Sequence, residues 1–329
     1  MKKICIFITI AVALLTAGCK SGIIKPNCSG AAFDLLWIIN DDIYFSPAGD
    51  SLELCLNGAV PFLPQPEPQF NVIRMNHAMY DNLLQTTRNI LFVNVDPNRY
   101  TCVRIKMAKD VWAKGQAICV INAPAVDSLK EAVVRYGDGI VNYFVKAERE
   151  RMMDYYISNI NREALSRTNE MFGYDIAIPT SINRFKKGKD FLWMANGNPE
   201  EGQYLMIYTE PYLSKQQLTC EAILDRRDSV AKANIPGGLK GSYMTTERHH
   251  LYPESRDIEL NGQWAKETRG LWKMNGDCMG GPFVSITTID TATNKIVTVE
   301  GFVYAPSKEK RRYLRQMDAM VYSIKKHNN

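Results

Sequence analysis

The first third of the chain alternates short apolar runs with more polar stretches. These runs predict strands over residues 33–40, 70–75, 89–96, 102–107 and 117–123. The run at 89–96 is apolar almost throughout, which is typical of a strand at the centre of a sheet. Four prolines between residues 61 and 68 predict an extended connection.

Two helices are predicted between these strands, so this part of the chain is expected to be α/β. The first has Ser46 as its N-cap, Pro47 in its first turn and Gly58 just past its end. The second is shorter, because Asn76 can cap a helix that reaches only to about Thr86.

Residues 126–172 are compatible with a helix nearly throughout. Apolar residues such as Leu129, Val133 and Ile140 recur there at helical spacing, and the glycines at 137 and 139 predict a bend or a break. A helix of this length between two strand-rich stretches predicts a connector between domains. Its charged run at 148–151 is expected to be a solvated face.

The remaining residues predict an antiparallel sheet packed with helices. Strand-like runs lie at residues 174–195, where a basic turn divides two of them, and at 203–212, 242–250, 256–274, 282–290 and 295–305. Helices are expected from about Leu218 to Lys232 and from Lys308 to Lys325.

Turn residues and one apolar stripe complete this picture. Hairpin turns are predicted at Asn261-Gly262, Asn275-Gly276 and Thr293-Asn294. The last helix carries an apolar stripe made of Leu314, Met317, Val321 and Ile324. This order of strands and helices is similar to small sandwiches of the PsbP and Mog1 type, and the similarity concerns architecture alone.

The chain is therefore expected to be an α/β (α+β) protein of two domains. Residues 31–172 form an N-terminal α/β domain with the long connecting helix, and residues 173–329 form a C-terminal α+β sandwich. A length of 329 residues, with 46% hydrophobic and 23% charged residues, suits two ordinary globular domains. A net charge of +5 without a basic stripe argues against nucleic acid as a partner.

The N-terminus has the three parts of a secretory signal. Two lysines precede an apolar stretch, Ile4–Leu15, which is too short to span a bilayer and ends in small residues followed by Cys19. This arrangement resembles a bacterial lipoprotein box, so residues 1–18 are expected to be a signal peptide, Cys19 the lipidated residue and 19–30 a flexible tether. The alternative is a plain signal peptide in which Cys19 is incidental.

The residues after Cys19 bear on the membrane that would receive the anchor. Lys20 follows directly, and no acidic residue occurs before Asp34. The acidic signals for inner-membrane retention and for surface export are thus both absent, which favours the periplasmic face of the outer membrane, with the cell surface as the alternative. Removal of residues 1–18 would take away two lysines and lower the net charge to +3.

Six cysteines lie beyond Cys19, and the sequence leaves their pairing open. They are Cys28, Cys55, Cys102, Cys119, Cys220 and Cys278. No CxxC or CxxH motif occurs, so zinc and thioredoxin-type chemistry have no sequence support. Most of the six are expected to be buried free thiols, although Cys102 and Cys119 lie on neighbouring predicted strands that could pair.

One set of residues could support nucleophilic catalysis. Cys278 could act with His249 or His250 and with an acid, Asp277 or Glu247, and the glycines beside Cys278 could offer free backbone amides. The structural interpretation, in which this segment is only a turn between strands, is strongly favoured. No GxSxG motif indicates a hydrolase elbow.

Other site chemistry has less support. Adjacent histidines on a strand face opposite ways, so only one of His249 and His250 could join Glu247 on a metal. Neither phosphate-loop motif occurs, and no cofactor is expected.

Two groups of exposed-surface candidates remain. The three tryptophans predicted on strands of the second domain could stack on a sugar or peptide, but core positions are favoured; they are Trp193, Trp264 and Trp272. The basic residues of the last helix could meet anionic lipid or peptidoglycan, but a solvated face is favoured; they are Lys308, Lys310, Arg311, Arg312 and Arg315.

Six blocks of sequence follow one another in an order typical of one family. They are PFLPQPEPQFNV with RNILFVNVDP, then MAKDVWAKGQ, SYMTTE, RGLW, GDCMGGPFVS and VEGFVYAPSKEKRRYLRQMDAMVYS. In this order the chain resembles a family of uncharacterised Bacteroides-type lipoproteins, catalogued as domain of unknown function 4837. The resemblance implies a lipid anchor and an envelope setting, and it carries over no activity and no catalytic residue.

Together these observations predict a lipid-anchored envelope protein that binds or scaffolds. Its partners would be the membrane, through the lipid on Cys19, and an unknown envelope protein or ligand, held between the domains or on the second sheet. The alternative is an envelope hydrolase that uses Cys278 with His249 or His250.

Overall fold

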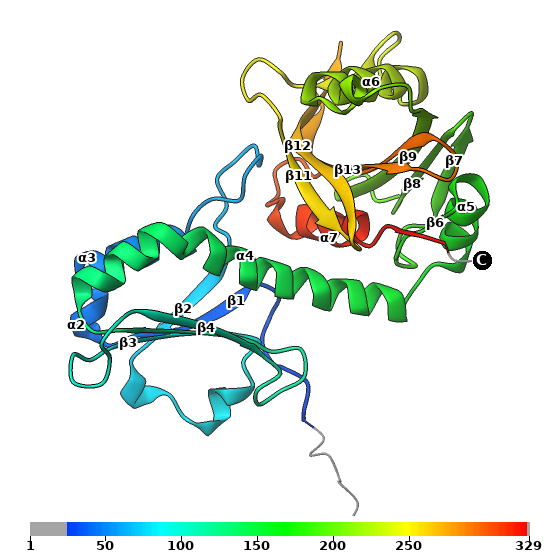
Figure 1. The fold of residues 1–329 in the computed structure, drawn as a ribbon. Coiled ribbons are helices and arrows are strands. Elements are labelled where there is room, and N and C mark those ends of the chain that lie inside the picture. The colour runs from blue at the N-terminus through cyan, green and yellow to red at the C-terminus, as the bar shows by residue number, and fades with distance from the viewer. Residues whose placement is uncertain (1–24, 328–329) are drawn as a thin grey trace, which may run out of the picture.

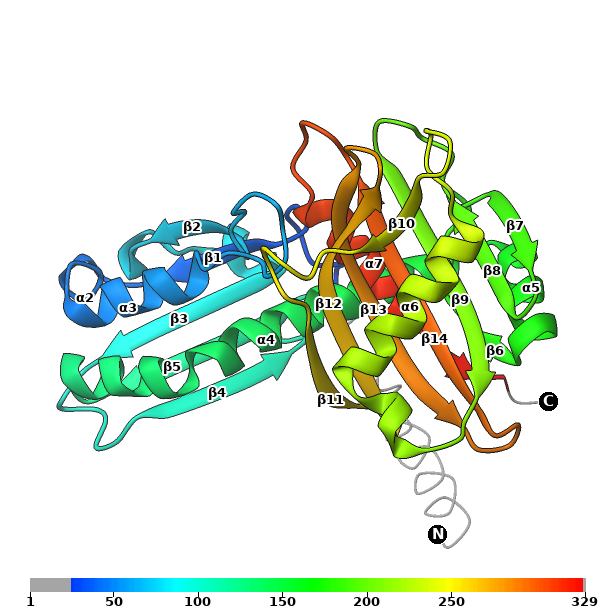
Figure 2. The ribbon, with the colours of Figure 1, turned by 90° about the horizontal axis from the view of Figure 1, so that it is seen from above.

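A computed structural model describes residues 25–327 of the chain. Figures 1 and 2 show two lobes, each built on its own sheet, with the long helix α4 (Val126–Ser158) running from the first lobe to the second. The predicted fold class is confirmed: an α/β lobe is followed by a lobe of antiparallel strands packed with helices. Within residues 25–327 no helix is both long and apolar enough to cross a membrane.

The first lobe is built on a five-stranded sheet in the order β2-β1-β3-β5-β4. Its strands are β1 (Asp34–Ile38), β2 (Asn71–Met75), β3 (Asn89–Val95), β4 (Arg104–Lys109) and β5 (Ala117–Ala123). The first four strands of that order run parallel, and only β4 is antiparallel to its neighbour. The central position of β3 agrees with its apolar run.

The two faces of this sheet are covered differently. α2 (Asp41–Tyr44) leads into α3 (Pro47–Leu56), and α3 packs with the first half of α4 over Leu35 and Trp37 of β1. The opposite face carries Leu36 and Ile38 and is covered by the short segment after β2. Residues 35–38 of β1 thus point alternately to opposite faces and are all buried, as the continuous apolar run requires.

The second lobe is built on an eight-stranded antiparallel sheet in the order β10-β12-β13-β14-β9-β8-β7, with β11 on the same edge of β12 as β10. Its strands are β7 (Arg184–Gly188), β8 (Phe191–Ala195), β9 (Gly202–Pro211), β10 (Tyr243–Thr246), β11 (Glu254–Leu260), β12 (Gln263–Asn275), β13 (Gly280–Asp290) and β14 (Lys295–Tyr304). A separate short pair joins β6 (Tyr174–Asp175) to β15 (Lys325–Lys326).

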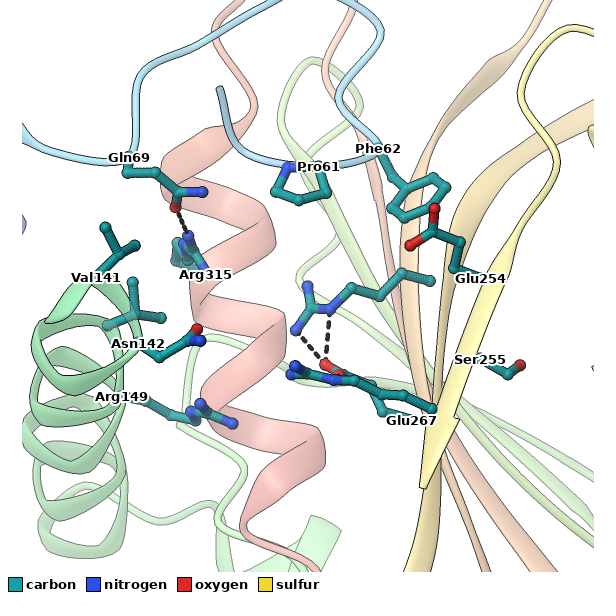
Figure 3. A pocket seen from close by; sticks show the side chains of 13 residues that line it. Pro61, Phe62, Gln69, Val141, Asn142, Arg149, Glu254, Ser255, Glu267 and Arg315 are labelled. Carbon is teal, nitrogen blue, oxygen red and sulfur yellow. Dashed lines mark hydrogen bonds and ion pairs between the residues drawn. The ribbon is translucent and has the colours of Figure 1, made fainter. Parts of the chain in front are cut away.

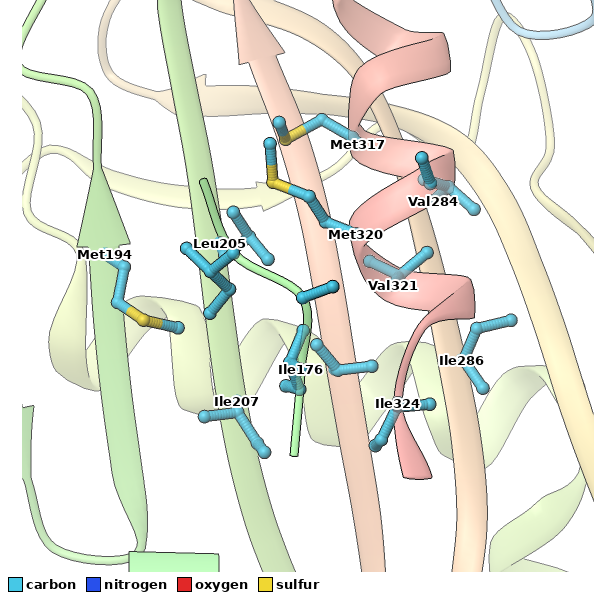
Figure 4. Close-up of a cluster of buried hydrophobic side chains, with 14 of the residues drawn as sticks. Ile176, Met194, Leu205, Ile207, Val284, Ile286, Met317, Met320, Val321 and Ile324 are labelled. Atoms are coloured by element: carbon cyan, nitrogen blue, oxygen red, sulfur yellow. The ribbon is translucent and has the colours of Figure 1, made fainter. Parts of the chain in front are cut away.

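Helices cover both faces of this second sheet. α6 (Cys220–Asn234) lies on one face and α7 (Arg311–Tyr322) on the other (Figure 1). The apolar stripe predicted for the last helix is confirmed, because all four of its residues are at most 3% exposed. Figure 4 shows Met317 and Val321 of this stripe facing the apolar side chains of β9 and β13, such as Ile207 and Val284. Burial of each such side chain contributes about 1.5–3 kcal/mol before entropy losses.

The long helical stretch differs from the prediction in where it breaks. α4 is unbroken at Gly137 and Gly139, where a bend or a break was expected, and a Cβ at Gly137 would lie 2.8 Å from the Sγ of Cys55 on α3. That glycine therefore allows two helices to pack closely. The helix ends instead before Asn161, whose side chain caps α5 (Arg162–Phe172) by accepting hydrogen bonds from the amides of Glu163 and Ala164.

The helix α5 belongs to the second lobe by its packing. Ala164 and Phe172 lie in the apolar cluster of the second sheet, with Ile207 and Val284. The sequence placed residues 162–172 in the N-terminal domain, so the boundary expected at 172 and 173 falls one helix too late. Periodicity alone identified the helix and could not tell which core its apolar side enters.

Local signals predicted most turns correctly. Asn261 (φ 53°) and Gly262 (φ 75°) form the left-handed pair that joins β11 to β12, and the other two expected hairpin turns join β12 to β13 and β13 to β14. The helix expected from Asn76 to about Thr86 is instead two 3-10 turns. Asp81 separates them, because its carboxylate caps the second turn.

The segment before β1 is attached to the first lobe over part of its length. The amide of Cys28 donates to the carbonyl of Lys114 (3.0 Å) and that of Ser29 to the carbonyl of Thr86 (2.8 Å). The stretch 19–30 was expected to be a flexible tether, and its described part is hydrogen-bonded through its backbone to the first lobe from Pro26 onward, where the carbonyl of Pro26 accepts from the amide of Lys114 (2.7 Å). The expected signal peptide and the lipidation site Cys19 lie outside the described residues.

Candidate functional site between the two lobes

The N-terminus of α7 is held by a carboxylate from the other lobe. Glu67, in the proline-rich connection before β2, accepts hydrogen bonds from the backbone amides of Lys310 (2.6 Å) and Arg311 (2.7 Å). Amides at the start of a helix have no partner within it, and negative charge is favourable there. The Arg311 side chain donates in turn to the carbonyl of Pro68 (2.6 Å). The lobes are thus joined at this point by directed hydrogen bonds.

A cavity of about 210 Å³ lies beside this junction. It is bounded by α4, α7, the β11–β12 hairpin and the proline-rich connection, so both lobes contribute to its wall (Figure 3). Its charged lining consists of Arg149, Arg256, Arg269, Arg315, Glu254 and Glu267. The apolar part of the wall includes Val141 and Val145 of α4.

Glu267 forms ion pairs with the two arginines of the β11–β12 hairpin that line the cavity. Only 2% of its side chain is exposed, and both Arg256 and Arg269 donate to it, the latter from Nε at 2.6 Å. Burial alone would raise the pKa of Glu267, yet Arg269 and Arg256 hold that pKa at about 2. Arg269 also reaches across to Asp318 of α7 at 2.6 Å. These ions therefore tie the β11–β12 hairpin to α7.

Arg315 is a buried cation with incomplete hydrogen bonding. Arg315 is 7% exposed. Its Nη2 donates to Gln69, and its Nη1 lies 3.3 Å from an oxygen of Asp318. Its Nε is buried and has no partner within residues 25–327. Burial lowers the pKa of Arg315 to about 10; Asp318 opposes this effect and Arg269 adds to it. The wall of the cavity thus carries positive charge that the surrounding carboxylates only partly balance.

Arg149 extends from α4 into the same space (Figure 3). The centre of its guanidinium lies 3.6 Å from the ring centroid of Tyr322, which is a close cation–π contact. Within the described part of the chain its guanidinium forms no ion pair and no hydrogen bond with a side chain or carbonyl. Stacking covers one face of the guanidinium and leaves its N–H edges for other acceptors.

The candidate nucleophile does not meet its candidate base. Cys278 is exposed, and among the described hydrogen bonds none joins its thiol to His249 or His250. The His250 side chain is 89% exposed. Glu247 is bound by Lys273 at 2.9 Å and by the two histidine backbone amides, and these contacts hold its pKa at about 2. The nucleophile, base and acid expected of a hydrolase are therefore not brought together at Cys278.

The candidate metal ligands do not form a complete set among the described residues. His250 and Glu247 approach to 3.4 Å, but the residues that the structure describes contain no group of three or more His, Cys, Asp or Glu side chains that could hold a metal ion. His77 instead contacts the backbone carbonyl of Val93 at 3.0 Å.

The six cysteines beyond residue 25 are all free thiols. Cys102 and Cys119 do not pair, because Cys102 lies in the exposed loop before β4 and Cys119 lies within β5 opposite Met107. Burial raises the pKa of Cys119 to about 12. The expectation that most of these thiols are buried is wrong, since Cys102 and Cys278 are exposed and only Cys119 is buried.

The three tryptophans do not form one binding surface. Trp272 is 2% exposed and donates from its indole to the carbonyl of Val303 (3.0 Å), so it is a core residue. Trp193 stacks on Tyr204 with centroids 5.7 Å apart, on the sheet face that α6 covers. Trp264 is 37% exposed.

The residues that line the cavity were not identified from the sequence. The runs containing Arg149 and Arg315 were both expected to be solvated faces, yet Arg315 is buried, and so is Glu148, which binds Arg88 and Arg151 at 2.8 Å each. One local signal was available. Arg315 directly follows a stripe residue of the last helix and has an acid, Asp318, one turn later, which is the pattern of a buried ion pair.

Comparison with protein-family models gives two matches in series. Residues 161–323 match the family described as "Domain of unknown function (DUF4837)", and residues 28–156 match "Domain of unknown function (DUF8532)". The interval between the matches lies at the break between α4 and α5. A search of curated proteins found no match.

Solved structures give only distant similarity. A mutant of the protein Mog1 is 10% identical, with a TM-score of 0.32, and the match covers 48% of this chain and 92% of that one. A protein of Bacteroides thetaiotaomicron VPI-5482 is 9% identical, with a TM-score of 0.22, over 48% of this chain and 46% of that one.

Proposed function

We propose that the whole chain, whose residues 161–323 match the DUF4837 family model, is a lipid-anchored cell-envelope protein that binds a ligand in the cavity between its lobes. One observation carries the proposal: charged side chains from α4, α7 and the β11–β12 hairpin converge on a single cavity. Convergent polar groups in a concave, partly apolar pocket are the usual mark of a ligand site.

The envelope setting is inferred from the sequence before Lys25. The short apolar stretch, the small residues and Cys19 favour a lipid anchor, and the lack of acidic residues before Asp34 favours the periplasmic face of the outer membrane. Two or more acyl chains hold a protein stably on a membrane, because each buried CH₂ contributes about 0.8 kcal/mol.

The anchor can be tested by growing expressing cells with a labelled fatty acid. The chain should take up the label, Cys19→Ser should lose it, and Cys28→Ser, a matched change nearby, should keep it. An unlabelled wild-type chain, or equal labelling of Cys19→Ser, would refute lipidation at this residue. Gradient separation of inner and outer membranes then tests the location.

The ligand site can be tested on the chain isolated from envelopes. The purified full chain is denatured and any released small molecule is identified by mass spectrometry. Asn142→Trp, at an exposed position on the cavity wall, should block occupancy, whereas Asn98→Trp, in an exposed loop of the first lobe, should not. Equal recovery from all three chains would show that the cavity is not the site.

A further inference from the structure

We infer that the cavity binds the carboxylate or phosphate group of a small ligand between Arg149 and Arg315. This inference rests on the proposed function and specifies the chemistry of the ligand. Both arginines line the cavity, one from α4 and one from α7, and Figure 3 shows their side chains on the same side of it.

The first argument is the distribution of charge. Of the carboxylates at this junction, Glu267 is already shared by Arg256 and Arg269, and Asp318 is shared by Arg269 and Arg315. Glu254, the other carboxylate of the lining, lies beside Phe62 and away from Arg149 (Figure 3), and Arg149 has no ion pair within residues 25–327. An oxyanion in the cavity would supply the missing charge.

The second argument is the unused hydrogen-bonding capacity. The buried Nε of Arg315 has no partner among the described residues, and the edges of the Arg149 guanidinium are open because Tyr322 occupies only its face. Guanidinium groups bind carboxylates and phosphates through two parallel N–H donors, which a neutral oxygen cannot match in strength. A ligand oxyanion is therefore a better partner here than water.

The remaining wall limits where the charge of the ligand can lie and how large the ligand can be. Glu254 lies beside Phe62, away from Arg149 (Figure 3), so a second negative group would be repelled at that end. Val141 and Val145 offer apolar contact between the two ends. The volume is below that of pockets for drug-sized ligands, which indicates a small molecule with one anionic end.

Backbone strain at the same wall supports a binding role. Phe62 has φ 61°, in the left-handed region that a bulky residue rarely adopts, and it is 8% exposed. Such strain persists only where the surroundings enforce it, and it is concentrated at ligand sites. Here it places the aromatic ring of Phe62 on the wall opposite Arg149 and Arg315 (Figure 3).

The test is calorimetric titration of the full chain in detergent micelles. The probes are inorganic phosphate and acetate, with chloride at equal ionic strength as the reference. At least one oxyanion should bind saturably, and Arg149→Gln should weaken that binding by about tenfold or more, as expected for loss of hydrogen bonds to a charged group. Comparison of phosphate with acetate separates the two possible sources of the oxyanion.

Two further variants keep the result interpretable. Lys146→Gln removes the same charge from an exposed position on the same helix and should leave affinity within about twofold, since an exposed charge at that distance is largely screened. Arg149→Lys retains the charge without the paired donors and should fall between wild type and Arg149→Gln. If Arg149→Gln fails to fold, Arg149→Lys decides the question.

The results that would overturn this inference can be told apart from those that would overturn the proposed function. Absence of binding by both oxyanions, or equal binding by Arg149→Gln, overturns the inference. Recovery of an uncharged small molecule from the native chain, lost in Asn142→Trp, would also overturn it while supporting a ligand site in the cavity. Failure of the oxyanions together with recovery of no molecule would count against both.

Discussion

Replacing Arg227 by methionine should destabilise the second lobe more than any surface change. Arg227 of α6 is 1% exposed and binds the fully buried Glu300 of β14 through Nε (2.9 Å) and Nη2 (2.7 Å). Its Nη1 donates to Thr246 at 2.9 Å, and its guanidinium lies 4.2 Å from the ring centroid of Phe283. Methionine would fill much of the volume but leave Glu300 without a cation.

The expected loss follows from that uncompensated charge. Breaking a buried ion pair by removing one partner costs about 3–5 kcal/mol, whereas replacing both partners by apolar residues is often neutral. Urea unfolding at pH 8 should therefore show this loss for Arg227→Met and a substantial recovery for the double variant Arg227→Met/Glu300→Leu. Arg167→Met, which removes an exposed pair with Glu163, should cost at most about 1 kcal/mol.

The pH dependence gives an independent check on the cause. Burial raises the pKa of Glu300 and Arg227 opposes that rise, so removing Arg227 raises this pKa further. A carboxyl whose pKa is higher in the folded than in the unfolded chain takes up a proton on folding, which favours the folded state as pH falls. The loss caused by Arg227→Met should shrink between pH 8 and pH 5. A loss below 1 kcal/mol, or one that is the same at both pH values, would refute the reasoning.

Four further substitutions test the packing and the junction. Glu67→Ala should cost about 1–2 kcal/mol, the usual value of a helix cap, and amide exchange should accelerate at the start of α7; unchanged exchange would contradict its role. Gly301→Ala should cost about 1–3 kcal/mol in thermal unfolding, because its Cβ would lie 2.6 Å from the Cβ of Met317, whereas Gly139→Ala in α4 has open space and should stabilise by up to about 1 kcal/mol. Because the pKa of Glu267 is lower in the folded than in the unfolded chain, its ionised carboxylate stabilises the fold above pH 4.5, and this stabilisation is lost as the pH falls towards about 2. In urea unfolding, Glu267→Gln should therefore show a smaller change in the free energy of unfolding between these two pH values than the wild type.

The sequence predicted the elements of the fold better than their assignment to lobes. Strand β1 was predicted from a continuous apolar run, because both of its faces are buried, and the stripe of α7 was predicted from its helical period, because one face of that helix is buried. The lobe to which α5 belongs was not predicted, since Ala164 and Phe172 would suit the core of either lobe. Periodicity reports that a face is buried and not what buries it.

The cavity residues were missed for a related physical reason. The sequence pattern of a helix suggests a solvated arginine unless its partner is known, and Arg315 has, besides Asp318, a partner in Gln69, 246 residues earlier. The candidates Cys278 and His249 were visible because their side chains are of types that can act as nucleophile and base. Residue type alone proved a poor guide, since the structure leaves both residues exposed and without a mutual hydrogen bond.

The position of α7 would couple the proposed ligand binding to the association of the lobes. One side of this helix packs on the second sheet, its N-terminus is capped by Glu67 from the first lobe, and Arg315 points from it into the cavity wall. A ligand that binds only the joined lobes stabilises them by about 2.7 kcal/mol at 100 times its Kd. A ligand in the cavity would therefore also stabilise the junction between Glu67 and α7, because the same contacts hold the lobes together.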